Sequence, residues 1–214
     1  MITSALRQAF FWLIVRPFLL IVVGMNVRHR GRLPVEGPAI LVANHNSHLD
    51  TMALMTLLPS RLLRITRPVA AADYFLSNRI RAWFALHIIG IIPIERKGRT
   101  PGTDPLADVS QALERGEIVI VFPEGSRGEP EEMSALKKGV AHLARQHPTV
   151  PVVPVFMHGL GKSLPKDDWL PVPFFVDAFV GESMYGEADH DGFTQALSDR
   201  LDSLAGEGRF PTWG

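Results

Sequence analysis

Apolar and polar positions along the chain follow the pattern of an α/β protein. Short apolar runs rich in β-branched residues predict buried strands, and longer stretches with helical spacing lie between them. The predicted strands are residues 40–43, 68–72, 88–94, 117–122, 150–155 and 174–180. The predicted helices are residues 47–58, 76–87, 104–115, 133–146 and a closing helix that contains Phe193, Leu197, Leu201 and Leu204. We therefore expect an α/β fold with a mostly parallel central sheet flanked by helices.

The most apolar stretch is residues 10–24, which Arg16 and Pro17 interrupt. A membrane-spanning helix needs about 20 apolar residues, and proline kinks or ends a helix. The aromatic residues of this stretch suit a membrane interface, and the arginines at 28, 30 and 32 suit the anionic headgroups of a cytoplasmic leaflet. We expect residues 1–28 to form a membrane-associating helical segment and residues 29–214 to form the main domain.

Several interpretations of residues 10–24 remain open. A monotopic or re-entrant anchor accounts for the short length, the break and the basic flank. A single membrane span and a buried helix of a soluble core are alternatives. A signal peptide fits worst, because no small-x-small cleavage site lies between the apolar stretch and the arginines.

Composition narrows the function classes. A chain of 214 residues can form one domain with a sizeable core, or that domain with a small appendage. The formal net charge is zero, so no overall field attracts nucleic acid. The absence of cysteine excludes disulfides, thiolate zinc sites and a cysteine nucleophile.

The segment of residues 40–50 carries the first candidate chemistry, because a buried strand runs into a polar turn and a helix start. On one continuous helix His45 and Asp50 would point about 140° apart. They can meet if Ser47 caps the helix and His45 stays in the turn. Asp50 could then accept a hydrogen bond from one ring nitrogen of His45, leaving the other to take a proton. His48 would point to a different face, and Ser47 with Asp50 could also be an ordinary capping box.

Three further segments carry candidate residues. Residues 94–96 and 122–127 lie at the ends of predicted strands, and residues 150–155 form a predicted strand with two prolines. An arginine guanidinium can bind phosphate through two hydrogen bonds, and Gly125 lets the backbone approach a ligand closely. Taken singly, each has an ordinary interpretation. Arg96 could be a surface charge, Glu124 and Arg127 a turn ion pair, and the prolines of residues 150–155 markers of an edge strand.

Taken in order, the four blocks resemble those of the glycerolipid acyltransferases, the lysophosphatidic acid acyltransferase (PlsC-like) family. The blocks are Asn44-His45-x4-Asp50, Gly90-Ile-Ile-Pro-Ile-Glu-Arg96, Phe122-Pro-Glu-Gly-Ser-Arg127 and Val152-Val-Pro154-Val155. The resemblance covers about residues 30–160, and four ordered blocks are far more specific than an isolated His-x4-Asp. It implies that residues 29–214 are an acyltransferase catalytic domain of glycerolipid acyltransferase-like fold.

The resemblance also implies roles for residues. His45 would be the general base and Asp50 would orient it, while Pro154 would lie by the acyl donor. The acceptor and its phosphate would be bound by Arg96, Glu124, Gly125, Ser126 and Arg127. Lys137 is a further candidate for the headgroup. Ser126 stands where threonine is commoner in the family, and Pro93 and Glu95 stand where phenylalanine and aspartate are frequent, so the second block is the least secure.

The implied reaction moves a fatty acyl group from acyl-CoA or acyl carrier protein to the free hydroxyl of a lysophospholipid. The favoured acceptor is 1-acyl-glycerol-3-phosphate, which would give phosphatidic acid, and another lyso-lipid such as lyso-ornithine lipid is the alternative. No metal and no cofactor beyond the acyl donor is expected. The expected partners are membrane lipids and not nucleic acid, and the expected location is the cytoplasmic face of a membrane.

Two other function classes compete. A serine esterase or thioesterase would use Ser126, but the nucleophile elbow needs glycine two residues earlier, where Glu124 stands. A lipid-binding protein without activity would not need both His45 and Asp50.

Overall fold

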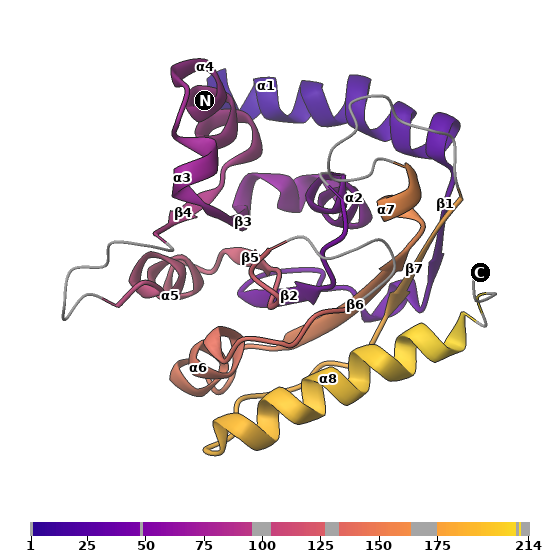
Figure 1. Cartoon of the computed structure of the whole chain (residues 1–214). Coiled ribbons are helices and arrows are strands. Elements are labelled where there is room, and N and C mark those ends of the chain that lie inside the picture. Colours follow the sequence, from indigo (N-terminus) through magenta and orange to yellow (C-terminus); the bar gives the residue numbers. More distant parts are fainter. Residues whose placement is uncertain are drawn as a thin grey trace.

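A computed structural model describes residues 2–47, 49–95, 104–126, 133–163, 175–208 and 210. A sheet forms the middle layer, and helices cover both of its faces (Figure 1). The helix that begins at the amino terminus runs across one side of the molecule, and the long α8 runs across the opposite side. The three layers are those of an α/β fold.

The sheet has seven strands in the order β1-β7-β6-β2-β5-β3-β4. Their bounds are β1 (Met25–Arg28), β2 (Ala39–Ala43), β3 (Thr66–Ala71), β4 (Ile92–Ile94), β5 (Ile118–Val121), β6 (Val152–His158) and β7 (Val176–Val180). β7 is antiparallel to β6 and parallel to β1, so β1 and β7 run opposite to the other five strands. The prediction of a mostly parallel sheet flanked by helices is confirmed.

The helices divide between the two faces of the sheet. Their bounds are α1 (Ile2–Phe10), α2 (Asp50–Leu57), α3 (Ala72–Phe75), α4 (Arg79–Phe84), α5 (Ala107–Glu114), α6 (Gly139–Gln146), α7 (Leu160–Ser163) and α8 (His190–Glu207). Shorter helical turns are η1 (Phe11–Val15), η2 (Phe18–Val23), η3 (Arg30–Arg32), η4 (Ser60–Ile65) and η5 (Ala85–Ile89). α5, α6 and α8 pack on one face, and α2 packs on the other together with η1, η2, η4 and η5.

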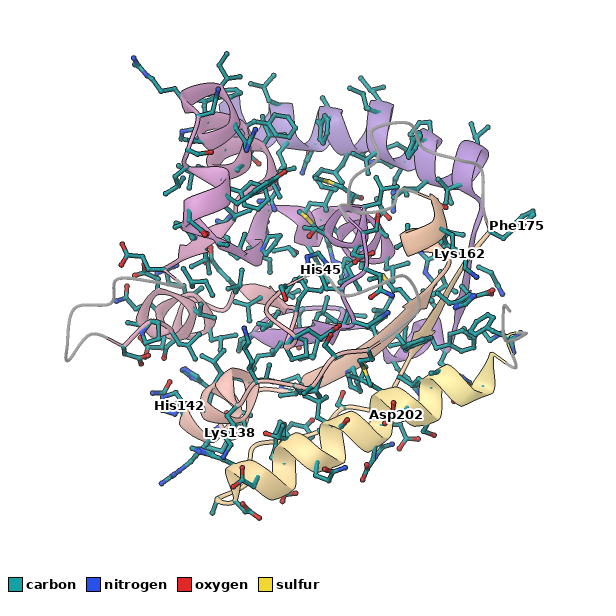
Figure 2. All side chains as sticks on the ribbon, in the orientation of Figure 1. His45, Lys138, His142, Lys162, Phe175 and Asp202 are labelled. Atoms are coloured by element: carbon teal, nitrogen blue, oxygen red, sulfur yellow. The ribbon has the colours of Figure 1, made fainter. Side chains whose placement is uncertain are left out.

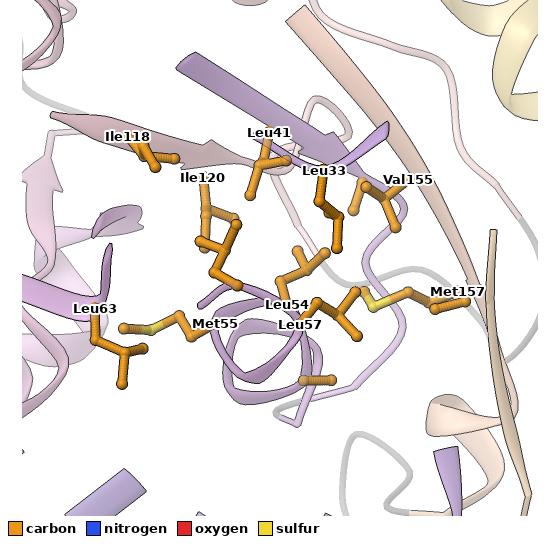
Figure 3. Packing of buried hydrophobic residues seen from close by; sticks show 14 of the residues in the cluster. Leu33, Leu41, Leu54, Met55, Leu57, Leu63, Ile118, Ile120, Val155 and Met157 are labelled. Atoms are coloured by element: carbon orange, nitrogen blue, oxygen red, sulfur yellow. The ribbon is translucent and has the colours of Figure 1, made fainter. Parts of the chain in front are cut away.

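The core explains why α2 holds its place under the sheet. Leu41 and Ile120 point from neighbouring strands toward α2, where Leu54 and Leu57 meet them (Figure 3). Successive strand residues alternate between faces, so Ile40 points to the α5 and α6 side. Burial on both faces is usual for strands of a parallel sheet. The result is a rigid platform from which the strand ends project.

The amino-terminal segment is helical from Ile2 to Val23, and Pro17 does not end it. Pro17 lies between the π-helical turns η1 and η2, and the peptide N–H of Arg16 donates to the carbonyl of Phe11, five residues back. This wider turn relieves the demand for regular hydrogen bonds around a proline. β1 follows within two residues and pairs with β7, so the predicted boundary after residue 28 falls at the end of a strand of the main sheet.

The two elements predicted over residues 76–94 differ in the structure. The predicted helix over residues 76–87 begins only at Arg79 and continues through α4 and η5 to Ile89, and Ile80 on its predicted packing side is 81% exposed. The predicted strand over residues 88–94 is reduced to β4, because η5 continues to Ile89 and Gly90 adopts a left-handed conformation. β4 lies at the edge of the sheet, as the proline in it suggested.

Candidate active site

The candidate site lies at the carboxyl ends of β2 and β5. These strands are parallel neighbours, and Val42 lies in register with Val121. The turn that follows each strand therefore emerges at the same edge of the sheet, where open α/β sheets bind ligands. Figure 2 shows His45 near the centre of the molecule, just after the carboxyl end of β2.

The turn after β2 is folded around one carboxylate oxygen. Oδ2 of Asp50 accepts hydrogen bonds from Nδ1 of His45 at 2.9 Å, from the peptide N–H of Asn46 at 2.7 Å and from that of Ser47 at 2.8 Å. The predicted meeting of His45 and Asp50 is therefore present in the structure. The hydrogen bonds of the turn, rather than the geometry of the helix, hold the His45–Asp50 pair together.

The predicted start of this helix at Ser47 is wrong, because α2 begins at Asp50. Asp50 reaches back to two amides that precede the helix, which keeps residues 46–47 out of helical geometry. The hydroxyl of Ser47 accepts a hydrogen bond from the peptide N–H of Leu49 at 3.2 Å. Asp50 is thus the first helical residue rather than the third.

With Asp50 ionised, its contact with His45 assigns the protons of the pair. An ionised carboxylate only accepts hydrogen bonds, so Nδ1 of His45 carries a proton and Nε2 of the neutral ring is the nitrogen that can take one. The Asp50 side chain is 2% exposed and that of His45 is 20% exposed. Burial raises the pKa of Asp50 above its ordinary value, and the hydrogen bonds from His45 and the two amides oppose that shift.

Glu124 joins the two turns. Its Oε1 accepts a hydrogen bond from the peptide N–H of His45 and its Oε2 accepts one from Ser134, both at 2.8 Å. The ring of Phe122, from the same turn, stacks on His45 with centroids 4.1 Å apart. The buried Glu124 therefore fixes the backbone of the histidine, while Phe122 fixes its ring.

The segment before α6 is held by the turn after β5. The peptide N–H of Lys137 donates to the carbonyl of Pro123 at 2.9 Å, and Ser134 donates to Glu124. The prediction of a helix from residue 133 is therefore wrong, because these amides are used by the turn and α6 begins at Gly139. This segment instead brings Lys137 to the site.

Gly125, Ser126 and Lys137 lie together beside Glu124. Gly125 has a φ of +74°, and a side chain there would meet the Lys137 side chain. Ser126 and Lys137 are exposed, so a hydroxyl and an ammonium group are accessible next to the two turns. The predicted residues Arg96 and Arg127, and also His48, lie outside the described residues.

Pro154 is placed differently from the other predicted site residues. It lies within β6 in register with Val42, before the end of the strand. It packs toward Gly181, on the face of the sheet that α8 covers. The structure does not bring its side chain to the turn that carries His45.

Asn44 is a residue whose importance the sequence reasoning missed. Its Nδ2 donates to the carbonyl of Met157 and its Oδ1 accepts from the peptide N–H of Met157, both at 2.8 Å. The turn after β2 is thereby fixed to β6. The available signal was a polar side chain directly after a fully buried strand, because such a group needs a partner.

Comparison with known proteins agrees with this geometry. A sequence model described as Acyltransferase matches residues 24–158. The chain is 34% identical over 137 residues to human 1-acyl-sn-glycerol-3-phosphate acyltransferase alpha, a match that covers 63% of this chain and 46% of that protein. It is 25% identical over 190 residues to 1-acyl-sn-glycerol-3-phosphate acyltransferase of Pseudomonas aeruginosa, covering 87% of this chain and 70% of that protein.

The fold is also similar to a solved structure. The crystal structure of the 1-acyl-sn-glycerophosphate (LPA) acyltransferase PlsC from Thermotoga maritima superposes with a TM-score of 0.77 at 19% sequence identity. The superposition covers 98% of this chain and 81% of that one. The match to the human protein, in contrast, spans just under half of its length.

Proposed function

This chain belongs to the acyltransferase family, and on that premise we propose that it transfers a fatty acyl group to the free hydroxyl of 1-acyl-glycerol-3-phosphate. The observation that carries the proposal is the His45–Asp50 pair, held at 2.9 Å at the carboxyl edge of the sheet. The names of the human and bacterial relatives support this acceptor. The acyl donor is a thioester, acyl-CoA or acyl carrier protein.

In the proposed reaction Nε2 of His45 takes the proton of the acceptor hydroxyl while its oxygen attacks the thioester carbonyl. The carbon–sulfur bond then breaks, and the thiolate leaves with the proton returned from the imidazolium. Asp50 stabilises that imidazolium and fixes its tautomer without taking the proton. A positioned base contributes about 10²–10⁴-fold in rate, and holding both reactants together contributes at least as much.

We assign the acceptor phosphate to Arg96, Arg127 and Lys137. Lys137 is exposed beside Gly125, which supports its part in this assignment. Glu124 has both oxygens on backbone amides, so its proposed role is to position His45 rather than to touch the acceptor. Ser126 is the exposed hydroxyl of the same turn, and Pro154 is proposed to support the acyl donor region from within β6.

We propose that the amino-terminal helix lies in one leaflet on the cytoplasmic side of a membrane. The stretch Thr3–Ile21 is long and apolar enough to cross a bilayer, by length and composition alone. However, Phe11, Val15 and Leu19 form a stripe that is buried against the core. The opposite side exposes apolar residues, with Ile21 81% exposed. One protein-facing and one lipid-facing side suit a helix in the membrane plane.

The test is acyl transfer by the full chain from radiolabelled acyl-CoA and acyl carrier protein to a panel of lyso-lipids. We expect transfer to 1-acyl-glycerol-3-phosphate by the wild type and none above background by His45→Ala. His142→Ala, on α6, is the matched control and should stay within twofold of the wild type.

Other outcomes separate the alternatives. Transfer to a different lyso-lipid, such as lyso-ornithine lipid, would keep His45 as the base and reject the proposed acceptor. Thioester hydrolysis that depends on Ser126 and not on His45 would reject the acyltransferase mechanism in favour of the esterase. Membrane binding without any transfer would favour the lipid-binding class.

A further inference from the structure

A cavity lies at the amino ends of the parallel strands, opposite to the carboxyl ends where His45 lies. It has a volume of about 470 Å³ and is bordered by α1, by the amino ends of β3 and β4, and by α5. Gly90 precedes β4 by two residues, whereas His45 follows the carboxyl end of the parallel strand β2. The cavity is therefore separate from the candidate active site.

Four arginines line this cavity, namely Arg7, Arg64, Arg67 and Arg115. Arg67 and Arg115 share the carboxylate of Glu117, at 2.8 and 3.1 Å. Arg64 is exposed on η4 and makes no ion pair within the described part of the chain. Counting Glu117 and the lining residue Asp108 as anions still leaves two positive charges, in a chain whose formal net charge is zero.

Arg7 is the buried member of this group. Its side chain is 3% exposed, and one of its terminal nitrogens donates to the carbonyls of Thr66 at 2.6 Å and Ile89 at 2.7 Å. Its Nε is buried and has no hydrogen-bond partner among the described residues. Burial, and then the charge of Arg67, lower the pKa of Arg7 to about 10, which Glu117 partly offsets. A buried cation without a carboxylate of its own is costly.

The guanidinium groups of Arg7 and Arg67 lie close together in the cavity. A side chain at Gly90 would overlap the guanidinium groups of both Arg7 and Arg67, so both groups lie next to the same backbone position. Capping of η5 accounts for the contact of Arg7 with the Ile89 carbonyl, and the contact with the Thr66 carbonyl fixes α1 to the start of β3. Capping accounts neither for the buried Nε of Arg7, which has no partner among the described residues, nor for the position of Arg64.

We propose that this cavity binds a phosphate group, as a phosphomonoester carried by a lipid headgroup or as free phosphate. A dianion matches the two uncompensated charges, and planar guanidinium groups bind phosphate oxygens in pairs. The hydroxyls of Thr3 and Ser4 supply neutral donors at the rim. Leu86 also lines the cavity and is 39% exposed, so an acyl chain could leave the cavity along an apolar surface.

The test measures binding to the full chain in detergent by calorimetry and by the rise of Tm, since a ligand that binds the native state stabilises it. One arm uses inorganic phosphate at fixed ionic strength. The other arm uses short-chain phosphatidic acid, with short-chain phosphatidylcholine for comparison. Both arms use the Arg127→Gln background, which weakens phosphate binding at the proposed acceptor site.

The variants Arg64→Gln and Arg64→Glu remove or reverse one lining charge at an exposed position that should not affect folding. We expect Arg64→Gln to weaken binding about tenfold and Arg64→Glu to weaken it further. Arg61 lies on the same helical turn, η4, but outside this cavity, so the affinity of Arg61→Gln should stay within twofold of that of the unsubstituted protein. Binding by phosphatidic acid alone identifies a headgroup site, and equal binding by inorganic phosphate identifies a free-phosphate site.

Two results would overturn the proposal. One is the absence of binding by either ligand, and the other is the same weakening in Arg61→Gln as in the Arg64 variants. The readout is binding without turnover, so a failure of the proposed acyl transfer would not alter it. Conversely, an Arg64 substitution that abolishes phosphate binding in the Arg127→Gln background but leaves acyl transfer unchanged when Arg127 is intact would separate the two sites.

Discussion

At the scale of single residues, Asp50 organises the candidate site. Its Oδ2 accepts hydrogen bonds from the ring of His45 and from two peptide N–H groups, so one atom both orders the turn and orients the imidazole. We predict that Asp50→Asn lowers kcat by about 10³–10⁴-fold, because an amide neither fixes the tautomer nor stabilises the imidazolium. Steady-state kinetics should show KM within a few-fold of the wild type. A kcat within tenfold of the wild type would contradict the proposed role.

The burial of Asp50 predicts a pH dependence of stability. Because its folded pKa is raised, the folded state holds this proton over a pH range in which the unfolded state has lost it. Its contribution to the free energy of unfolding is therefore greatest at low pH and falls as pH rises through the folded pKa. We predict that His45→Ala loses stability relative to His45→Ala with Asp50→Asn as pH rises from about 4 toward 7.

Urea unfolding of the two variants at several pH values checks this, and the His45→Ala background removes the titration of the imidazole. Asp202→Asn, at an exposed position on α8, is the control for loss of any carboxylate. A difference that grows in the opposite direction would mean that the hydrogen bonds outweigh burial.

Glu124 offers a test of positioning against direct substrate contact. Glu124→Ala leaves the peptide N–H groups of His45 and Ser134 without their acceptor. We predict a loss of about 0.5–1.5 kcal/mol in the free energy of unfolding for each of these partly buried hydrogen bonds. We also predict a lower kcat with little change in KM, whereas a residue that binds acceptor would raise KM. Glu124→Gln should be intermediate, and the exposed Glu187→Ala should match the wild type.

At the scale of elements, apolar patterning predicted β2 to β7, most of which are short buried runs rich in β-branched residues. It missed β1, whose residues alternate between partly buried and exposed positions. The His45–Asp50 contact was also predictable from spacing and turn chemistry. The beginning of α6 was not, because the amides of Ser134 and Lys137 donate to the preceding turn, at Glu124 and Pro123, outside any helical repeat. Hydrogen bonds of this kind leave no mark in a local pattern.

The packing side of α4 was also misjudged, for a different reason. Helical periodicity shows that apolar residues share a side but not what covers it. Ile80 and Trp83 lie on the same side of the helix, and their exposed fractions are 81% and 49%, respectively. The four-block resemblance added what patterning lacked, namely roles for His45 and Asp50 and candidates in the turn after β5.

The two sides of the amino-terminal helix should respond differently to substitution. We predict that Leu13→Glu, at a position 75% exposed, weakens binding to vesicles about tenfold to hundredfold, because burying a leucine-sized side chain contributes about 1.5–3 kcal/mol. It should leave the unfolding free energy unchanged. Phe11→Ala, at a position 0% exposed, should instead lower the unfolding free energy by about 3–5 kcal/mol. Vesicle flotation and urea unfolding distinguish the two, and equal effects of both would contradict the two-sided helix.

At the scale of the whole molecule, two exposed apolar surfaces adjoin. Phe10 and Phe84 pack edge to face with ring centroids 5.1 Å apart, which fixes α4 beside the amino-terminal helix. Figure 1 shows both elements on the side of the molecule away from α8. Trp12 and Trp83 are 55% and 49% exposed on these two elements. A molecule that seats on a bilayer through this side would bring both indoles into the lipid.

The depth of Trp12 separates an in-plane helix from a spanning one, because Trp12 lies at the centre of the stretch Thr3–Ile21. A helix that spans places its centre near the bilayer midplane, about 15 Å below either surface of a hydrocarbon core of about 30 Å. A helix in the plane keeps its apolar side only about 5–10 Å deep. Two variants, each with a single tryptophan at position 12 or 83 and phenylalanine at the other three tryptophan positions, allow each depth to be measured by brominated lipids.

We predict that lipids brominated near the headgroup quench Trp12 more strongly than lipids brominated near the chain end, and that Trp83 shows the same order. Spanning would reverse the order for Trp12 alone, since α4 is anchored to the folded domain. Absence of quenching at Trp83 with shallow quenching at Trp12 would confine membrane contact to the amino-terminal helix. The shallow result at both positions would fix the molecule on the bilayer by two elements, with the sheet and its candidate active site held outside the hydrocarbon core.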